Sequence, residues 1–274
     1  MNYIAYKIKG ISIIKILAVL AIIISAMLMS SQYYQHQGFS VFELMLILTS
    51  DKLVLSTIIT LPIIVLASNI LQYDYVEFQA LIRLQNTGKW FKYNIYSIII
   101  NVSIFILFYY LIMFFVGILS NFDFSYNWIL PKTFNMTISI NGFDYTGNPF
   151  VLLINDNISP GIAIFVEYFM LILRCIFYIL LARCVYNLVK NNFVSILVVI
   201  CFNYFDIYFY DITNLSKLFI MPHEYSIITS IAGQSPSIIS AILYWGILIL
   251  TVFVLTKMNL QPTLEKFITN KSLY

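Results

Sequence analysis

Six long apolar stretches dominate this sequence and leave the chain few ways to fold. They run over Ile11–Met29, Leu53–Gln72, Ile95–Leu119, Gly161–Leu188, Phe193–Tyr210 and Ile238–Met258. The hydrocarbon core of a bilayer is about 30 Å thick, so a helix rising about 1.5 Å per residue needs about 20 apolar residues to cross it. Since each stretch is close to that length or longer, we expect an all-α membrane protein with six transmembrane helices.

The composition favours a membrane over water as the surrounding of the chain. Hydrophobic residues make up 61% of the chain and charged residues 10%, against roughly 25% charged residues in an average soluble domain. The connections between the apolar stretches are short, and the largest, about Ser120–Pro160, is below the usual size of a domain. We therefore expect residues 1–274 to form a single transmembrane domain.

The distribution of Lys and Arg predicts the orientation of the chain. The net charge of +3 gives no reason to expect a nucleic-acid partner. One set of span ends is rich in basic residues: Lys7, Lys9, Lys15, Arg83, Lys89, Lys92, Arg183, Lys190, Lys257, Lys266 and Lys271. The other set has only Lys52, Lys132 and Lys217. By the positive-inside rule, both termini are expected in the cytoplasm.

The composition also indicates which membrane to expect. The chain is rich in Ile, Asn, Tyr, Phe and Lys, which suggests an AT-rich bacterial genome and hence a bacterial plasma membrane.

The few cysteines and histidines form no metal or disulfide pattern. The cysteines are Cys175, Cys184 and Cys201, in or beside the fourth and fifth stretches. His223-Glu224 lacks the second histidine of a zinc-binding HExxH helix. We expect buried free thiols, no metal site and no cofactor.

The sequence also lacks the motifs of a nucleotide-binding enzyme. Gly88-Lys89 superficially resembles a phosphate loop, but Arg83 stands where the first glycine belongs, and Trp90 replaces the Ser or Thr that would hold magnesium. No G-x-S-x-G elbow for serine chemistry is present. We therefore expect no enzymatic activity in this chain, and any ATP that drives it is hydrolysed by a separate subunit.

Four connecting segments have distinct expected structures. Met1–Gly10 is amphipathic and suits an interfacial helix before the first span. Val41–Leu48 is too short to cross the bilayer and is expected as a helix on the outer surface. Thr133–Ile140 followed by Asn141-Gly142 indicates a β-hairpin. Asp211–Pro236, before the sixth span, has the length and polarity of a partly re-entrant loop.

The loop Tyr73–Asn94, between spans two and three, differs from the others. It combines charged with apolar residues at helical spacing, which predicts an amphipathic cytoplasmic helix ending near Asn86–Gly88. Such a helix is suited to transmit force from a cytoplasmic motor. It is equally consistent with an ordinary interfacial helix, in which Trp90, Phe91 and Tyr93 form an aromatic belt.

Ionisable residues inside the spans are functional candidates, because they are costly there. Glu167 and Arg174 lie seven residues apart on one face of the fourth span. They form either a structural ion pair or part of a pathway or gate. Asp206 is expected to reach the interface among tyrosines. Three asparagines are candidates for hydrogen bonds between helices: Asn69, Asn101 and Asn203.

In this arrangement the chain resembles the ABC-2-like permease subunits of bacterial ABC exporters. The segment Ala80–Lys92, with Arg83 followed by Lys89-Trp90, is similar to the Arg, then Lys/Arg-Trp, pattern of these permeases where the chain re-enters the membrane. The resemblance covers nearly the whole chain in architecture, but the outer loop Ser120–Pro160 is longer than the minimal plan requires.

The resemblance implies a coupling helix within Tyr73–Asn94 that docks on a separate ATPase subunit, with Glu77, Arg83, Lys89, Trp90 and Lys92 as its contact residues. It also implies a second permease subunit, either a copy of this chain or a relative, that completes the substrate path. Permeases of this kind often serve export of, or immunity to, antimicrobial peptides, so a hydrophobic or antimicrobial peptide is the expected substrate.

Two other functions remain open on the sequence. An ion-coupled secondary transporter would use Glu167 and Arg174 in its pathway, although inverted repeats and paired broken helices are not evident in the sequence. A non-transporting membrane immunity protein would protect the cell even when the partner ATPase is inactive.

Overall fold

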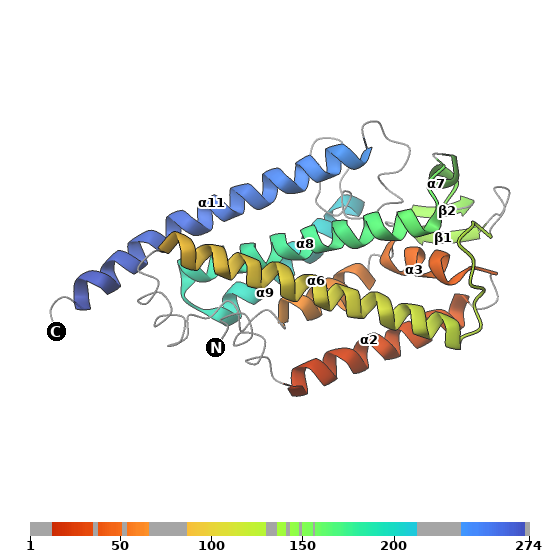
Figure 1. Cartoon of the computed structure of the whole chain (residues 1–274), viewed down its shortest axis with the longest axis horizontal. Coiled ribbons are helices and arrows are strands. Elements are labelled where there is room, and N and C mark those ends of the chain that lie inside the picture. The colour runs from red at the N-terminus through yellow and green to blue at the C-terminus, as the bar shows by residue number, and fades with distance from the viewer. Residues whose placement is uncertain are drawn as a thin grey trace.

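The computed structural model describes residues 13–34, 38–50, 54–65, 87–129, 136–140, 143–147, 150–155, 157–212 and 237–271. In chain order the elements are α2 (Ile13–Tyr34), α3 (Val41–Ser50), the π-helix η2 (Val54–Thr60), α6 (Thr87–Leu119), β1 (Met136–Ile140), β2 (Phe143–Gly147), α7 (Val151–Asn155), α8 (Pro160–Val189), α9 (Asn192–Ile212) and α11 (Ser237–Lys271) (Figure 1). The described part is mostly helical, as predicted.

The long apolar helices make this chain a membrane protein. Lys92–Leu119 in α6, Pro160–Val189 in α8 and Ile238–Met258 in α11 are each long and apolar enough to cross a bilayer. A fourth crossing results if α3 and the helical residues Val54–Val65 count as one bent span. The described apolar parts of α2 and α9 are shorter. Six crossings therefore remain a prediction.

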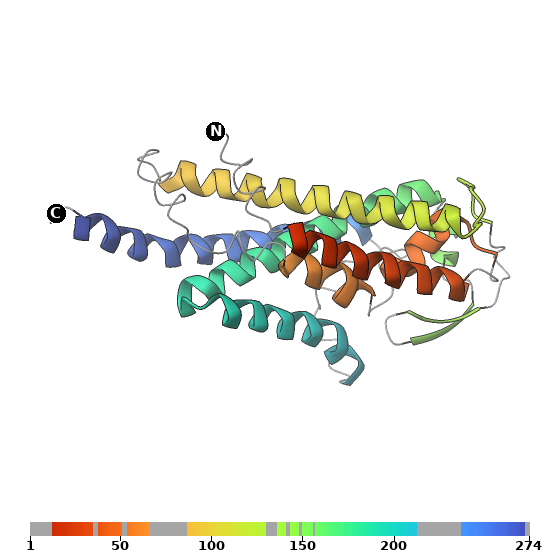
Figure 2. The same cartoon turned by 90° about the horizontal axis from the view of Figure 1, so that it is seen from below.

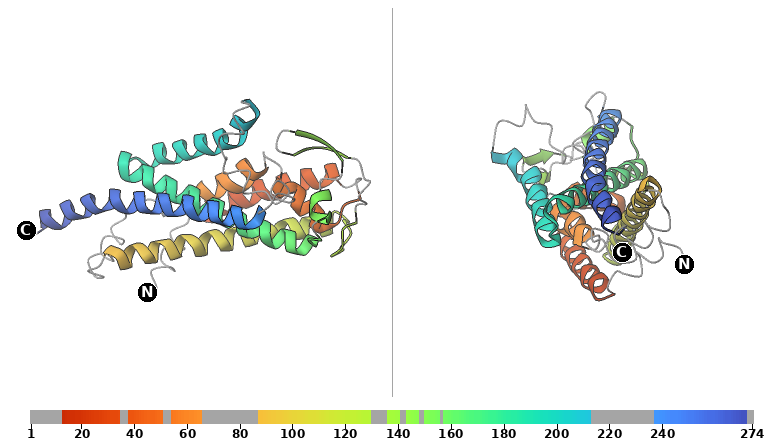
Figure 3. Two further views of the ribbon diagram at one scale, coloured as in Figure 1. Left: turned by 90° about the horizontal axis from the view of Figure 1, so that it is seen from above. Right: turned by 90° about the vertical axis from the view of Figure 1, so that its left-hand side faces the viewer.

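The helices form an elongated antiparallel bundle with α8 at its centre. Helices α2, α6 and α9 run toward the end that carries the β-hairpin, and α8 and α11 run back from it (Figures 1 and 2). Helix α8 packs against α3, α6, α9 and α11, and Figure 3 shows the bundle from another side and end-on. In the most apolar part of α8, 61% of the residues are buried within the protein, against 17% in that of α11. Side chains on α8 are therefore the ones best placed to meet several other helices.

Local sequence explains why α8 begins and ends where it does. Ser159 is the N-cap and its side chain accepts a hydrogen bond from Ile162 N at 3.4 Å, while Pro160 occupies the first turn, where its missing N–H costs nothing. Lys190 ends the helix in a left-handed conformation (φ 57°), and its N–H donates to Tyr186 O at 2.8 Å. Desolvation at this turn lowers the pKa of Lys190. Because α9 begins two residues later, α8 and α9 are antiparallel neighbours.

Helix α3 is correctly predicted as a helix but wrongly placed on the outer surface. Val41, Leu46 and Glu43 have no exposed area, and α3 packs against both α6 and α8. It makes an angle of 97° with the helical residues Val54–Val65. A helix that is apolar on all sides is typical of a buried position, and α3 accordingly fills the interior beside the start of α8.

The β-hairpin lies where the Asn141-Gly142 turn signal predicts it. Strands β1 and β2 are antiparallel, with Met136 opposite Gly147 and Ile140 opposite Phe143. They form a two-stranded sheet at the end of the bundle (Figure 2). This hairpin is the one β-sheet within the described residues.

Several predicted boundaries change. Helix α6 begins at Thr87, eight residues before the predicted start of the third span at Ile95. Helix α11 continues to Lys271, beyond the predicted end at Met258. Arg183, counted among the basic span ends, is fully buried within α8. The N-terminal interfacial helix, most of the coupling segment and the re-entrant loop lie outside the described residues.

Candidate functional site

An ion pair lies in the interior of the bundle between α8 and α9. Arg174 Nη2 is 3.4 Å from Asp206 Oδ2, and the two side chains are 0% and 1% exposed. A buried charge is expensive unless it is paired and hydrogen-bonded. The prediction of Asp206 at the membrane interface is wrong, because its carboxylate is buried as the counter-ion of Arg174.

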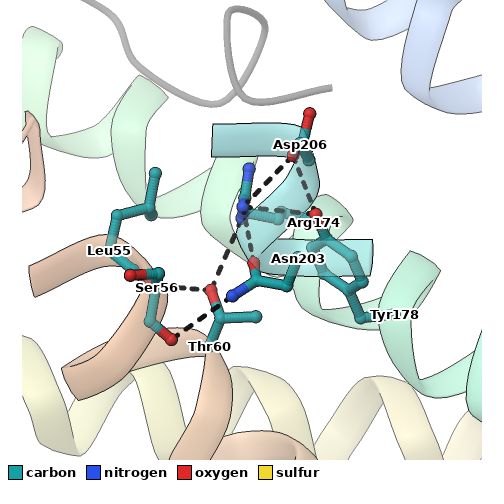
Figure 4. A network of polar contacts seen from close by, with 7 residues as sticks. All are labelled: Leu55, Ser56, Thr60, Arg174, Tyr178, Asn203 and Asp206. Atoms are coloured by element: carbon teal, nitrogen blue, oxygen red, sulfur yellow. Dashed lines mark hydrogen bonds and ion pairs between the residues drawn. The ribbon is translucent and has the colours of Figure 1, made fainter. Parts of the chain in front are cut away.

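Further polar groups surround the guanidinium (Figure 4). Arg174 Nη2 donates to Asn203 Oδ1 at 2.8 Å and to the Tyr178 hydroxyl at 3.3 Å. The Tyr178 hydroxyl in turn donates to Asp206 Oδ2 at 2.8 Å, and the ring centroid of Tyr178 lies 5.0 Å from Arg174 Cζ. These contacts compensate both charges, as a buried ion pair requires.

The same network reaches a third element, the π-helix η2. Arg174 Nε donates to Thr60 Oγ1 at 3.4 Å, and Thr60 Oγ1 donates to Leu55 O, five residues back, at 2.7 Å. Asn203 Nδ2 donates to Ser56 O at 3.5 Å. Because π-helical turns are rare and often mark functional sites, the joining of η2 to α8 and α9 through these side chains defines the candidate site. We call Ser56, Thr60, Arg174, Tyr178, Asn203 and Asp206 the polar network.

The second predicted ionisable residue, Glu167, lies two turns before Arg174 on α8 and is also fully buried. It interacts electrostatically with Tyr110 of α6. The Tyr110 ring makes an edge contact with Tyr168 at 5.7 Å, and the Tyr168 hydroxyl donates to Ser103 O at 3.1 Å. Among the described residues, Arg174 forms its ion pair with Asp206, and Glu167 lies beside tyrosines between α6 and α8.

The predicted ATPase-coupling residues are placed only in part. Glu77 and Arg83 lie outside the described residues. Lys89, Trp90 and Lys92 lie on the first turns of α6. Among these three residues, the structure describes the side chain of Lys92 alone. It is exposed, and its Nζ lies 5.6 Å from the ring centroid of Tyr96.

The asparagine predictions have mixed outcomes. Asn203 forms hydrogen bonds with residues of other helices, as predicted: it accepts from Arg174 and donates to Ser56 O. Asn101 instead donates to Ser97 Oγ within α6 at 3.3 Å, and Asn69 lies outside the described residues. Among the cysteines, Cys175 and Cys184 are buried free thiols as predicted, but Cys201 is exposed. Within the part of the chain that the structure describes, no three His, Cys, Asp or Glu side chains gather as metal ligands.

Sequence reasoning missed Tyr178, Asp206 and Thr60 as members of the site. Two of them had a usable signal: Tyr178 follows Arg174 by four residues, and Asp206 follows Asn203 by three, so each pair shares one helix face. Thr60 had none, because its role depends on the π-helical turn.

The fold and the polar network together define a polytopic helical membrane protein with a charged interior site. No protein-family model, curated protein or solved structure matches the chain.

Proposed function

We propose that the chain is the transmembrane permease subunit of a bacterial ATP-driven ABC exporter, with six crossings and both termini in the cytoplasm. The apolar helices of membrane-spanning length support a transport protein. The similarity of Ala80–Lys92 to the coupling region of ABC-2-like permeases supports a separate ATPase as its motor. On the same similarity we propose a hydrophobic or antimicrobial peptide as substrate, and a second permease subunit that completes its path.

One observation carries this proposal: the polar network contacts the helix that precedes the coupling-like segment. Residues 66–86, which include Glu77 and Arg83, follow the helical residues Val54–Val65 directly and lead directly into α6. A force on that segment therefore acts first on η2 and α6. Through Thr60, η2 is bonded to Arg174 of the central helix.

The π-helix η2 is suited to change its conformation under such a force. Its hydrogen bonds span five residues instead of four, and Pro62, the second residue after it, has no N–H to donate. A change between π and α geometry would rotate the Thr60 side chain relative to α8. Packed interiors respond to such changes by switching between discrete arrangements. Through the contact between η2 and Arg174, a conformational change in the motor can therefore alter the positions of α8 and α9.

Association with an ATPase tests the proposal. The tagged full-length chain is extracted from its native membranes in mild detergent, and the eluate is assayed for a stoichiometric ATP-hydrolysing protein. We expect such a protein to co-elute and to be lost from an Arg83→Ala variant. The matched control is Lys132→Ala, a basic residue predicted on the outer side. Elution of the intact wild-type chain without an ATPase would contradict the proposal.

The buried charges favour one alternative, an ion-coupled secondary transporter. Glu167, Arg174 and Asp206 all lie inside the bundle, where proton and ion pathways place such groups. Liposomes that contain the purified chain alone distinguish the two functions. Uptake driven by a proton or sodium gradient and abolished by Glu167→Gln supports the alternative, whereas the exporter model predicts no gradient-driven uptake.

A further inference from the structure

A cluster of aromatic rings lies beside the last turns of α6, at the end of the bundle where that helix stops. Phe124 and Tyr126, from the loop after α6, pack against Phe42 of α3 at ring distances of 5.3 and 5.2 Å. Phe124 also lies 5.8 Å from Phe114 of α6. Although they pack together, Phe124 and Tyr126 are 53% and 64% exposed. We call residues Phe122–Tyr126 the aromatic loop.

The exposed rings continue an apolar stripe that follows α6. The stripe consists of exposed residues at helical spacing, namely Ile104, Phe108, Leu111, Phe115 and Ile118. Since α6 is one of the helices able to cross a membrane, this stripe faces lipid. The aromatic loop therefore extends a lipid-facing surface beyond the end of the helix.

The length of α6 indicates how deep in the membrane the aromatic loop lies. At the other end of the helix, Lys92 and the exposed rings of Tyr93 and Tyr96 have the composition of a membrane–water boundary. From Tyr96 to Phe115 a helix rises about 29 Å, close to the roughly 30 Å thickness of the hydrocarbon core. We therefore expect Phe115, Phe124 and Tyr126 at the opposite boundary, where tyrosine is among the enriched residues.

The backbone of this loop is bonded to the start of α3. Val41 N donates to Asp123 O at 2.9 Å, and Ser40 and Asp123 form a parallel β-bridge. Glu43 accepts from Ser40 N at 2.7 Å and, through its other oxygen, from Ile129 N at 3.0 Å. Whatever holds the loop at one depth thus also holds the first turn of α3.

We propose that the aromatic loop inserts into the lipid interface opposite the Lys92 end of α6, and that this anchor fixes the depth of the buried helix α3. The partner is the boundary between headgroups and acyl chains, because the rings match its depth and continue the lipid-facing stripe. This proposal depends on the chain being a membrane protein and is independent of any ATPase.

Depth-dependent quenching tests the anchor. In a Cys201→Ala background, which removes the exposed thiol and leaves the two buried ones, Tyr126→Cys is labelled with an environment-sensitive fluorophore. The full-length protein is placed in phosphatidylcholine–phosphatidylglycerol nanodiscs. We expect stronger quenching by nitroxides near the headgroup than by nitroxides near the chain ends, and little quenching by aqueous iodide. Phe124→Cys provides a second labelling site if the first variant folds poorly.

Two controls calibrate the measurement. Phe108→Cys, at the middle of the stripe and 56% exposed, should be quenched most by nitroxides near the chain ends. Asn191→Cys, exposed in the turn between α8 and α9, should be quenched by iodide. A probe at position 126 that behaves like the one at position 191 would overturn the anchor and mark the aromatic loop as a water-facing surface for another molecule, such as a peptide.

Discussion

At the scale of single residues, the main feature is the buried charge of Arg174, which an ion pair and hydrogen bonds compensate. Arg174 is a fully buried cation in a helix of membrane-spanning length, and its bonds extend to side chains on α9 and η2. An unpaired charge at this depth costs at least about 2.5–3.5 kcal/mol. The network therefore makes the relative position of three elements depend on a few hydrogen bonds, which suits a site that has to switch.

Removing one partner of the ion pair should destabilise the protein strongly. We expect Asp206→Asn to lower the free energy of unfolding by about 3–5 kcal/mol, because the Arg174 charge stays buried without its counter-ion. Unfolding in mixed detergent–SDS micelles measures this loss. Asn101→Ala, whose amide bonds within α6, is the control and should cost about 0.6 kcal/mol. The double variant Arg174→Met/Asp206→Leu should be more stable than Asp206→Asn; if it is not, charge compensation is not the role of the pair.

Thr60 should act through its hydroxyl. Thr60→Val keeps the shape but loses the bonds to Leu55 O and Arg174 Nε, and we expect a loss of about 1–3 kcal/mol in the same unfolding assay. Thr60→Ser keeps the hydroxyl and should restore most of that stability. A loss of stability in Thr60→Ser but not in Thr60→Val would show that the methyl group, not the hydroxyl, holds η2 in place.

The sequence identified Arg174 and Asn203 as polar residues within the spans but gave no indication that Asp206 pairs with Arg174. Seven residues along one helix place Glu167 on the right face, yet the choice of partner depends on the rotation of α9, which puts Asp206 within reach. Helix rotation depends on packing between segments distant in sequence, so spacing within one helix cannot reveal it.

At the scale of elements, the least regular part of the bundle is the pair α3 and η2. Its two parts are bent by 97°, and α3 is held close to α6 by Gly117. A Cβ atom at Gly117 would lie 3.0 Å from Val41 Cγ1. Helices approach closely where a glycine leaves room, so this contact sets the position of α3.

Enlarging Gly117 should therefore displace α3. We expect Gly117→Ala to cost about 1–3 kcal/mol of stability from overpacking, measured as the thermal unfolding of the purified protein in detergent. Val41→Ala added to it should recover part of the loss, because it removes the two methyl groups in contact. Strictly additive losses in the double variant would mean that the two residues do not touch.

The elements were predictable to different degrees. The bounds of α8 follow from a long apolar run with Ser159-Pro160 before it, and the hairpin follows from Asn141-Gly142. Helix α3 was misplaced because a short apolar helix has no pattern that separates a surface position from a buried one. The start of α6 was missed because Thr87–Asn94 is polar enough to be mistaken for a separate segment.

At the scale of the whole molecule, the alternating directions of the helices predict which ends share a side of the membrane. The turn between α8 and α9 lies at the opposite end of the bundle from the start of α8 and α7 (Figures 1 and 2). Together with the basic residues near the α8–α9 turn, this predicts that the turn is cytoplasmic.

Cysteine accessibility in intact cells tests that orientation. In the Cys201→Ala background we expect Asn155→Cys, exposed at the end of α7, to react with a membrane-impermeant maleimide. Asn191→Cys should react only after the cells are lysed. The reverse pattern would invert the orientation, and with it the side on which an ATPase can bind.

The membrane character of the chain follows from composition and helix length alone, whereas its function does not. Apolar length is a local property that each segment carries by itself. The proposed action of a motor on Arg83 and its neighbours is a relation to another molecule, and the length and apolar character of the helices carry no information about it.

Hydrogen–deuterium exchange in the complex that we propose with an ATPase tests the central claim most directly. The account predicts that ATP changes amide exchange in residues 54–65, because a movement of the inner connection reaches η2 and its bond to Arg174 before the rest of the bundle. Exchange in residues 17–29 of α2 should stay constant and serves as the internal reference. Exchange in residues 54–65 that is the same with and without ATP, in a complex that hydrolyses it, would contradict the account.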